Sequence, residues 1–80
     1  MPTVMRIGAF RFFFYSNEGQ EPAHIHVQAD SRVAKFWLQP VSLASSMGFS
    51  AKELNQLLGL VREHEVLFME AWNDFFNIKR

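Results

Sequence analysis

Two histidines separated by one residue, His24 and His26, are the side chains of this sequence whose type and spacing could do chemistry. Side chains at i and i+2 of a strand point the same way, so both imidazoles would share one sheet face. Imidazole titrates near neutral pH, so one ring could take a proton while the other gives one. The pair is therefore the candidate catalytic set for metal-independent cleavage of RNA.

The same spacing occurs among metal ligands, but a metal site needs three or four ligand groups. His64 is the only other histidine, and we expect it on the flank of a helix, on the opposite side of the sheet. We interpret His64 as a structural residue whose ring nitrogens are hydrogen-bonded to a neighbouring group. We therefore predict no cofactor and no three-histidine site within one chain, while a zinc site shared between protomers stays open.

The front half of the chain has the pattern of three strands. The first lies within about residues 4–15 and is densest in aromatics from Ile7 to Tyr15, and the others are about 24–29 and 32–38. Aromatic and β-branched residues suit strands, and the short links between them favour an antiparallel meander. No strand is predicted from Val41 to Gly48, a link with room for a short turn of helix.

The back half has the pattern of one helix over about residues 50–76. Ser50 and Glu53 form a capping box, with Phe49 and Leu54 as a hydrophobic staple. One apolar stripe follows: Leu54, Leu57, Leu58, Val61, Phe68, Trp72 and Phe75. Such a helix is roughly 40 Å long, against a domain diameter of about 30 Å. Either it breaks, with Gly59 the candidate position, or its aromatic end overhangs and needs a partner chain.

The predicted fold is therefore α+β, a single domain over residues 1–80 with a three-stranded antiparallel sheet packed on one face against a long C-terminal helix. Strand alternation defines an inner face: Phe10, Phe12, Phe14, Ile25, Val27, Ala29, Ala34, Phe36 and Leu38. It also defines an outer face: Arg11, Phe13, Tyr15, His24, His26, Gln28, Val33, Lys35 and Trp37. The inner face is wholly apolar, so we expect the helix there.

The outer face is the candidate binding surface. Arg11 or Lys35 could hold a phosphate, and Tyr15 or Trp37 could stack on a base. Exposed Phe13 and Trp37 would form the kind of aromatic patch that marks an interaction site, and we expect a homodimer with Trp37 and Phe76 as its anchors.

Composition excludes several classes of protein. The chain has 49% hydrophobic and 15% aromatic residues, too many for a disordered tail. Eight basic residues balance eight acidic ones, so the chain lacks the net positive charge that favours nonspecific binding to DNA or an anionic membrane. With no cysteine, disulfides and thiolate metal sites are excluded. No apolar run approaches the roughly 20 residues of a membrane span, so we expect a cytoplasmic location.

Several segments resemble a bacterial domain-of-unknown-function family numbered 4160. They are Met1–Thr3, Glu21–Val27 (EPAHIHV), Ala34–Val41 (AKFWLQPV), Gly48–Ser50, Glu53–Leu54, Leu60–Val61 and Glu70–Trp72. Family members often have two prolines before the first histidine, where this chain has Pro22 and Ala23. The resemblance implies a small bacterial cytosolic protein, the toxin-like member of a type II toxin–antitoxin pair. The implied cognate antitoxin-like partner belongs to another such family, numbered 2442.

Two function hypotheses follow. In the first, the protein binds a cognate protein through its aromatic and histidine face, which needs only exposed aromatics. In the second, it is an RNA-cleaving toxin using His24 and His26, which also needs a basic cluster to hold phosphate. Only Arg11 and Lys35 could supply that cluster. We therefore favour the binding hypothesis.

Overall fold

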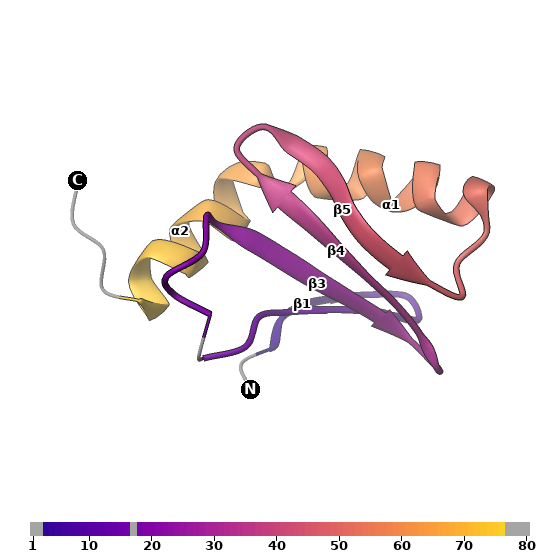
Figure 1. Ribbon diagram of the computed structural model, residues 1–80, viewed down its shortest axis with the longest axis horizontal. Coiled ribbons are helices and arrows are strands. Elements are labelled where there is room, and N and C mark those ends of the chain that lie inside the picture. Colours follow the sequence, from indigo (N-terminus) through magenta and orange to yellow (C-terminus); the bar gives the residue numbers. More distant parts are fainter. Residues whose placement is uncertain (1–2, 17, 77–80) are drawn as a thin grey trace.

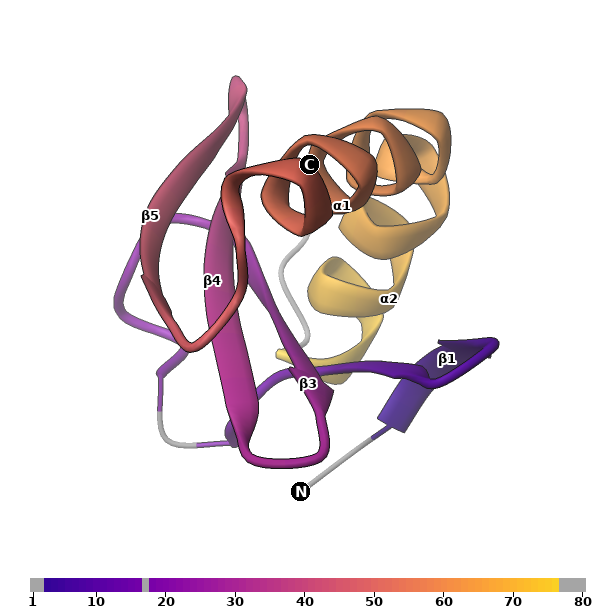
Figure 2. The ribbon, with the colours of Figure 1, turned by 90° about the vertical axis from the view of Figure 1, so that its right-hand side faces the viewer.

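The computed structural model describes residues 3–16 and 18–76, which form a five-stranded sheet followed by two helices. The elements are β1 (Thr3–Ile7), β2 (Phe10–Phe13), β3 (His24–Ala29), β4 (Arg32–Leu38), β5 (Val41–Met47), α1 (Ala51–Glu63) and α2 (Glu65–Phe75). The strands lie side by side in chain order and every pair is antiparallel. Both helices lie on one side of the sheet (Figures 1 and 2). The α+β class and the antiparallel meander are confirmed, but the prediction of three strands and one helix was wrong.

The predicted first strand is in fact a hairpin. Its two strands, β1 and β2, turn at Gly8 and Ala9, and Ile7 pairs with Phe10 across that turn. Gly8 has φ 57, a left-handed conformation that glycine adopts without a steric penalty. The aromatic run hid this turn because Gly8 and Ala9 lie inside it.

The fifth strand, β5, occupies the link that was expected to hold a helical turn. It pairs with β4 along its whole length. Val41 lies opposite Leu38 and Met47 lies opposite Val33, with a register shift between Lys35 and Phe36 of β4. The small polar residues of β5 have little intrinsic strand preference, so the strand forms because β4 offers unpaired backbone groups. Gly48 follows with φ 95, which turns the chain toward α1.

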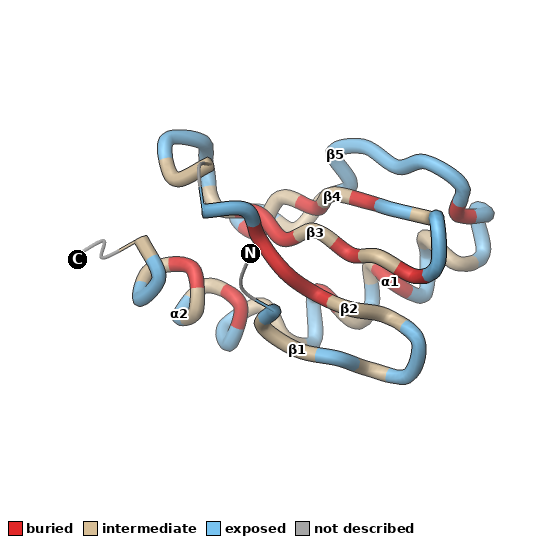
Figure 3. Tube along the Cα trace, turned by 90° about the horizontal axis from the view of Figure 1, so that it is seen from below, coloured by how far each residue is buried: buried red, intermediate tan, exposed pale blue. Residues whose placement is uncertain are grey.

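The core lies between the sheet and the helices. Of the predicted inner face, all but the partly buried Phe10 are buried, and they pack with Leu57, Val61, Phe68 and Trp72 of the helices. Figure 3 shows buried residues recurring along β2, β3 and β4, whereas β5 is mostly exposed. The predicted inner face is therefore confirmed, and it meets the helices.

The C-terminal helix breaks at His64 and not at Gly59. His64 ends α1 and begins α2, and its Nδ1 donates to the Leu60 carbonyl oxygen at 2.9 Å. A side chain that bonds to the helix's own carbonyl is one cause of a kink. Of the two alternatives, a break or an overhanging end, the structure shows the break: Trp72 is 2% exposed, although Phe75 is 43% exposed. Among the described residues, no helix is long and apolar enough to cross a membrane.

The predicted capping box is confirmed at the start of α1. The Glu53 backbone N–H donates to Ser50 Oγ at 3.1 Å, and the Ser50 N–H donates to Glu53 Oε1 at 3.0 Å. Arg32 of β4 also forms an ion pair with the Glu53 carboxylate. The cap therefore joins the helix start to the sheet.

Replacing Ser50 by alanine should lower the free energy of unfolding by about 1 kcal/mol, because the backbone N–H of Glu53 loses its acceptor. Denaturant melts measure this loss. Ser31→Ala, in the exposed turn between β3 and β4, is the control and should leave the midpoint unchanged. Equal midpoints for Ser50→Ala and the unmodified protein would contradict the capping role.

The capping box should also make stability depend on pH. The bond from the Ser50 backbone N–H, with help from Arg32, holds the pKa of Glu53 below its ordinary value. A lowered folded-state pKa stabilises the protein above the unfolded pKa, and the gain disappears as pH falls through the folded value. The stability difference between the unmodified protein and Glu53→Gln should therefore shrink as the pH falls below 4.5, the ordinary pKa of a glutamate. Denaturant melts over a pH series measure it, and a constant difference would contradict the assignment.

Candidate functional site

A glutamate completes the histidine pair. Oε1 of Glu18 lies 2.8 Å from Nε2 of His24 and 2.8 Å from Nε2 of His26. The three ligand atoms all lie within 4.8 Å of one another. The two rings were predicted to lie within reach of each other, and the structure shows that a carboxylate joins them.

The loop between β2 and β3 carries Glu18 to the histidines. Its backbone turns are closed by two hydrogen bonds, Glu18 N–H to the Tyr15 oxygen at 3.3 Å and Glu21 N–H to the Glu18 oxygen at 3.1 Å. Gly19 packs on the end of the helical layer: a Cβ there would lie 2.5 Å from Cδ1 of Phe76. Only glycine lets the loop come this close, so the position of Glu18 depends on the aromatic end of α2.

His24 is buried, although strand alternation predicted it on the outer face, away from the helices. Its exposed fraction is 0%, and its ring lies between Trp37 of β4, at 5.7 Å, and Trp72 of α2, at 4.8 Å between ring centroids. The pleat puts His24 and His26 on one face, but Trp72 reaches the end of the sheet where β3 begins. His24 therefore belongs to the packing between sheet and helix.

His26 lies within a group of rings on the outer face. It stacks on Phe13 with centroids 5.4 Å apart and meets the edge of Tyr15 at 4.7 Å. These neighbours, with the Arg11 guanidinium 4.2 Å from the Phe13 centroid, leave Phe13 only 2% exposed. The prediction of an exposed Phe13 was wrong because residues of its own face cover it.

Charge in the site is set by burial and by the shared carboxylate. Burial alone would raise the pKa of Glu18, but hydrogen bonds from His24 and His26 outweigh it and leave that pKa below its ordinary value. Burial lowers the pKa of His26, although the bond to Glu18 opposes this. The site therefore favours an ionised carboxylate beside a neutral His26 ring at neutral pH.

Both ring nitrogens of His24 face oxygen atoms. Nδ1 lies 2.9 Å from the carbonyl oxygen of Pro22, which can only accept, so Nδ1 carries a hydrogen. In a neutral ring Nε2 then presents a lone pair to Oε1 of Glu18. A hydrogen bond at this contact therefore needs a second proton on the ring, and without that proton the two lone pairs repel unless a metal ion binds between them.

The two cations predicted to hold a phosphate are already paired. Lys35 donates to Glu21 at 2.7 Å, and its Nζ lies 4.5 Å from the ring centroid of Trp37. Arg11 donates to Gln28 at 2.9 Å and to Thr3 at 3.2 Å. An incoming phosphate would have to displace these partners.

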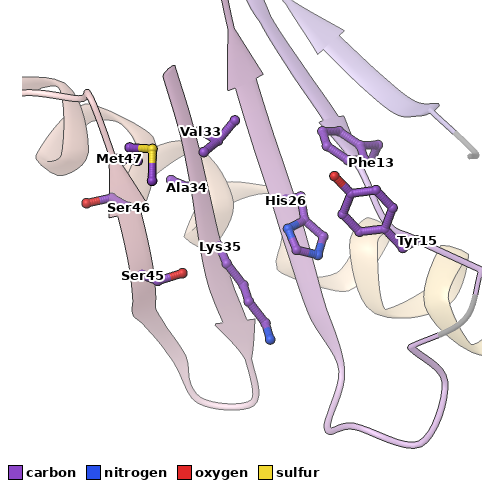
Figure 4. Close-up of a pocket in the computed structure, with 9 residues that line it drawn as sticks. All are labelled: Phe13, Tyr15, His26, Val33, Ala34, Lys35, Ser45, Ser46 and Met47. Carbon is purple, nitrogen blue, oxygen red and sulfur yellow. The ribbon is translucent and has the colours of Figure 1, made fainter. Parts of the chain in front are cut away.

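An open hollow of about 280 Å³ lies on the sheet face that the helices leave uncovered (Figure 4). Its lining residues come from the end of β2 and from β3, β4 and β5: Phe13, Tyr15, His26, Val33, Ala34, Lys35, Ser45, Ser46 and Met47. Three predicted site residues, Tyr15, His26 and Lys35, thus meet there. Arg11 and Trp37 do not line it.

The family match agrees with the segments around this site. Residues 9–73 match the family described as Domain of unknown function (DUF4160). The chain belongs to this family. Comparison with curated proteins and with solved structures finds no match. The family description assigns no activity, so the function of this DUF4160 member is argued from its own geometry.

Sequence reasoning missed Glu18 and the β5 part of the hollow. Glu18 stands in a turn-forming segment, SNEGQEP, and no periodicity relates a loop carboxylate to a strand. Gly19 in this segment indicates a turn, and nothing local in the sequence shows that the turn brings Glu18 to the histidines. His64 was excluded from the site as expected, because it bonds within its own helix and is not among the converging ligand atoms.

Burial predicts that the two histidines differ in their effect on stability. His24→Ala should cost about 2–4 kcal/mol, because it opens a cavity beside Trp37 and Trp72 and leaves the Pro22 oxygen without its donor. His26→Ala should cost less, since the ring is partly exposed. Denaturant melts of both variants measure the difference, and equal losses would contradict the burial of His24.

Proposed function

We propose that this protein binds a partner protein through the outer face of its sheet, as the toxin-like member of a bacterial type II toxin–antitoxin pair. The observation that carries the proposal is the hollow on the uncovered face. Met47 at its rim is 71% exposed, and Tyr15 and Val33 are 41% and 38% exposed. Apolar side chains gathered around a hollow on an uncovered sheet face are typical of an interaction site.

The partner that fits this surface offers an extended segment. β5 is an edge strand of the sheet, and its sequence, VSLASSM, contains no charged residue and no proline that would discourage pairing. An added strand would bond to the free backbone groups of β5, while one of its apolar side chains enters the hollow beside Met47. The cognate antitoxin-like protein is the proposed source of that segment.

The alternative, an RNA-cleaving toxin, has less support in the geometry. His24 has no exposed surface with which to reach a substrate. Both imidazoles contact one carboxylate oxygen, whereas acid–base cleavage needs the two rings on opposite sides of a phosphate. Lys35 and Arg11 are engaged elsewhere. The binding hypothesis needs none of these contacts to change.

Met47→Glu should weaken partner binding at least tenfold, because it places a charge at the rim of the apolar hollow. Calorimetric titration with a purified antitoxin-like protein of the family numbered 2442 from the same organism measures the affinity. Val66→Glu is the matched control: Val66 is 72% exposed on α2, on the helix side of the molecule. It should leave the affinity unchanged.

Other results would contradict the proposal. Equal affinities for the two glutamate variants would move the interface away from the hollow. Self-association that Met47→Glu abolishes, with no binding of the antitoxin-like protein, would make a second copy of this chain the occupant. Cleavage of RNA by the purified protein, abolished in His26→Ala, would favour the alternative.

A further inference from the structure

We propose that Glu18, His24 and His26 bind one divalent transition-metal ion, such as zinc, within a single chain. The three side chains supply two imidazole nitrogens and one carboxylate oxygen from the β2–β3 loop and from β3. The inference stands apart from partner binding, because every proposed ligand belongs to this chain.

Convergence of the ligand atoms is the first observation. Around a tetrahedral zinc ion with ligand distances near 2.0–2.1 Å, neighbouring ligand atoms lie about 3.3 Å apart. Here the Glu18 oxygen lies 2.8 Å from each Nε2, and all three atoms lie within 4.8 Å of one another. Small side-chain movements therefore separate the atoms enough to admit an ion.

The orientation of His24 is the second observation. Metal-binding histidines usually donate their other ring N–H to a carbonyl or carboxylate, which fixes the tautomer and aims the lone pair at the metal. His24 does this: Nδ1 donates to the Pro22 oxygen at 2.9 Å, which leaves Nε2 as the nitrogen that faces Glu18. Trp37 and Trp72 hold the ring in that orientation.

Graded exposure is the third observation. The side chain of His24 is 0% exposed, that of His26 is 15% and that of Glu18 is 22%. An ion could therefore enter from the side of Glu18 and His26 while His24 anchors it from within. A divalent ion would neutralise the charge of the carboxylate and would bond to the buried Nε2 of His24.

The donor set selects the class of metal. Two imidazoles with one carboxylate suit zinc, iron(II), cobalt and nickel, whereas calcium and magnesium prefer sites made of oxygen alone. Three protein ligands leave at least one coordination position for water or another group. Because His26 also lines the hollow, that ion would lie beside the proposed binding surface.

Titration of the untagged, chelator-treated protein with Zn²⁺ tests the site. Calorimetry should give one ion per chain. Glu18→Gln and His26→Ala should each weaken zinc binding more than about 100-fold, because a lost ligand costs more than a lost outer-shell partner. Glu63→Gln, at the exposed end of α1, and His64→Gln are matched controls for residue type, and both should keep the affinity of the unmodified protein.

X-ray absorption of the zinc-loaded, unmodified protein gives a second measurement that does not depend on how a variant folds. It should show two imidazole ligands, with oxygen atoms completing the sphere. The proposal is overturned if the unmodified protein does not bind Zn²⁺, if His64→Gln or Glu63→Gln loses binding as Glu18→Gln does, or if the spectrum shows three imidazoles or none.

Discussion

The contact of one carboxylate oxygen, Oε1 of Glu18, with two imidazoles is the constraint on which the account of this protein depends. A buried polar ring is tolerated only when its nitrogens are satisfied, so the burial of His24 depends on Glu18. Glu18 in turn depends on the β2–β3 loop, which Gly19 lets approach Phe76. Trp72 of α2 packs against the His24 ring from the helix side. The site and the end of the core therefore form one packed unit, and a change in either should affect the other.

Much of the fold could be predicted from the sequence because its signals are local. The two-residue alternation of β3 and β4 assigned the inner face, since a pleated strand leaves no other arrangement of its side chains. The start of α1 was predictable because the capping box lies within four residues, Ser50 to Glu53. The pairing of His24 with His26 also followed from spacing alone. These features need no knowledge of distant parts of the chain.

What the sequence did not predict depends on contacts between distant segments. β5 forms because β4 offers an unpaired edge, and its own residues give no strand signal. The helix breaks at His64, where φ is −107 and ψ is 18, whereas propensity pointed to Gly59. The contact of Trp72 with His24 joins residues far apart in the chain, so strand alternation could not show that His24 is buried. Glu18 was missed for the same reason, because a loop's path is set by what it packs against.

The central claim is that Glu18, His24 and His26 converge as one unit from which His64 is separate. Nitrogen-15 spectra of the histidine rings, recorded before and after one equivalent of Zn²⁺, test it most directly. The account predicts that the Nε2 signals of His24 and His26 move together, that Nδ1 of His24 keeps its hydrogen, and that His64 does not respond. Movement of the His64 signals, or an unchanged His24 beside a shifted His26, would contradict it.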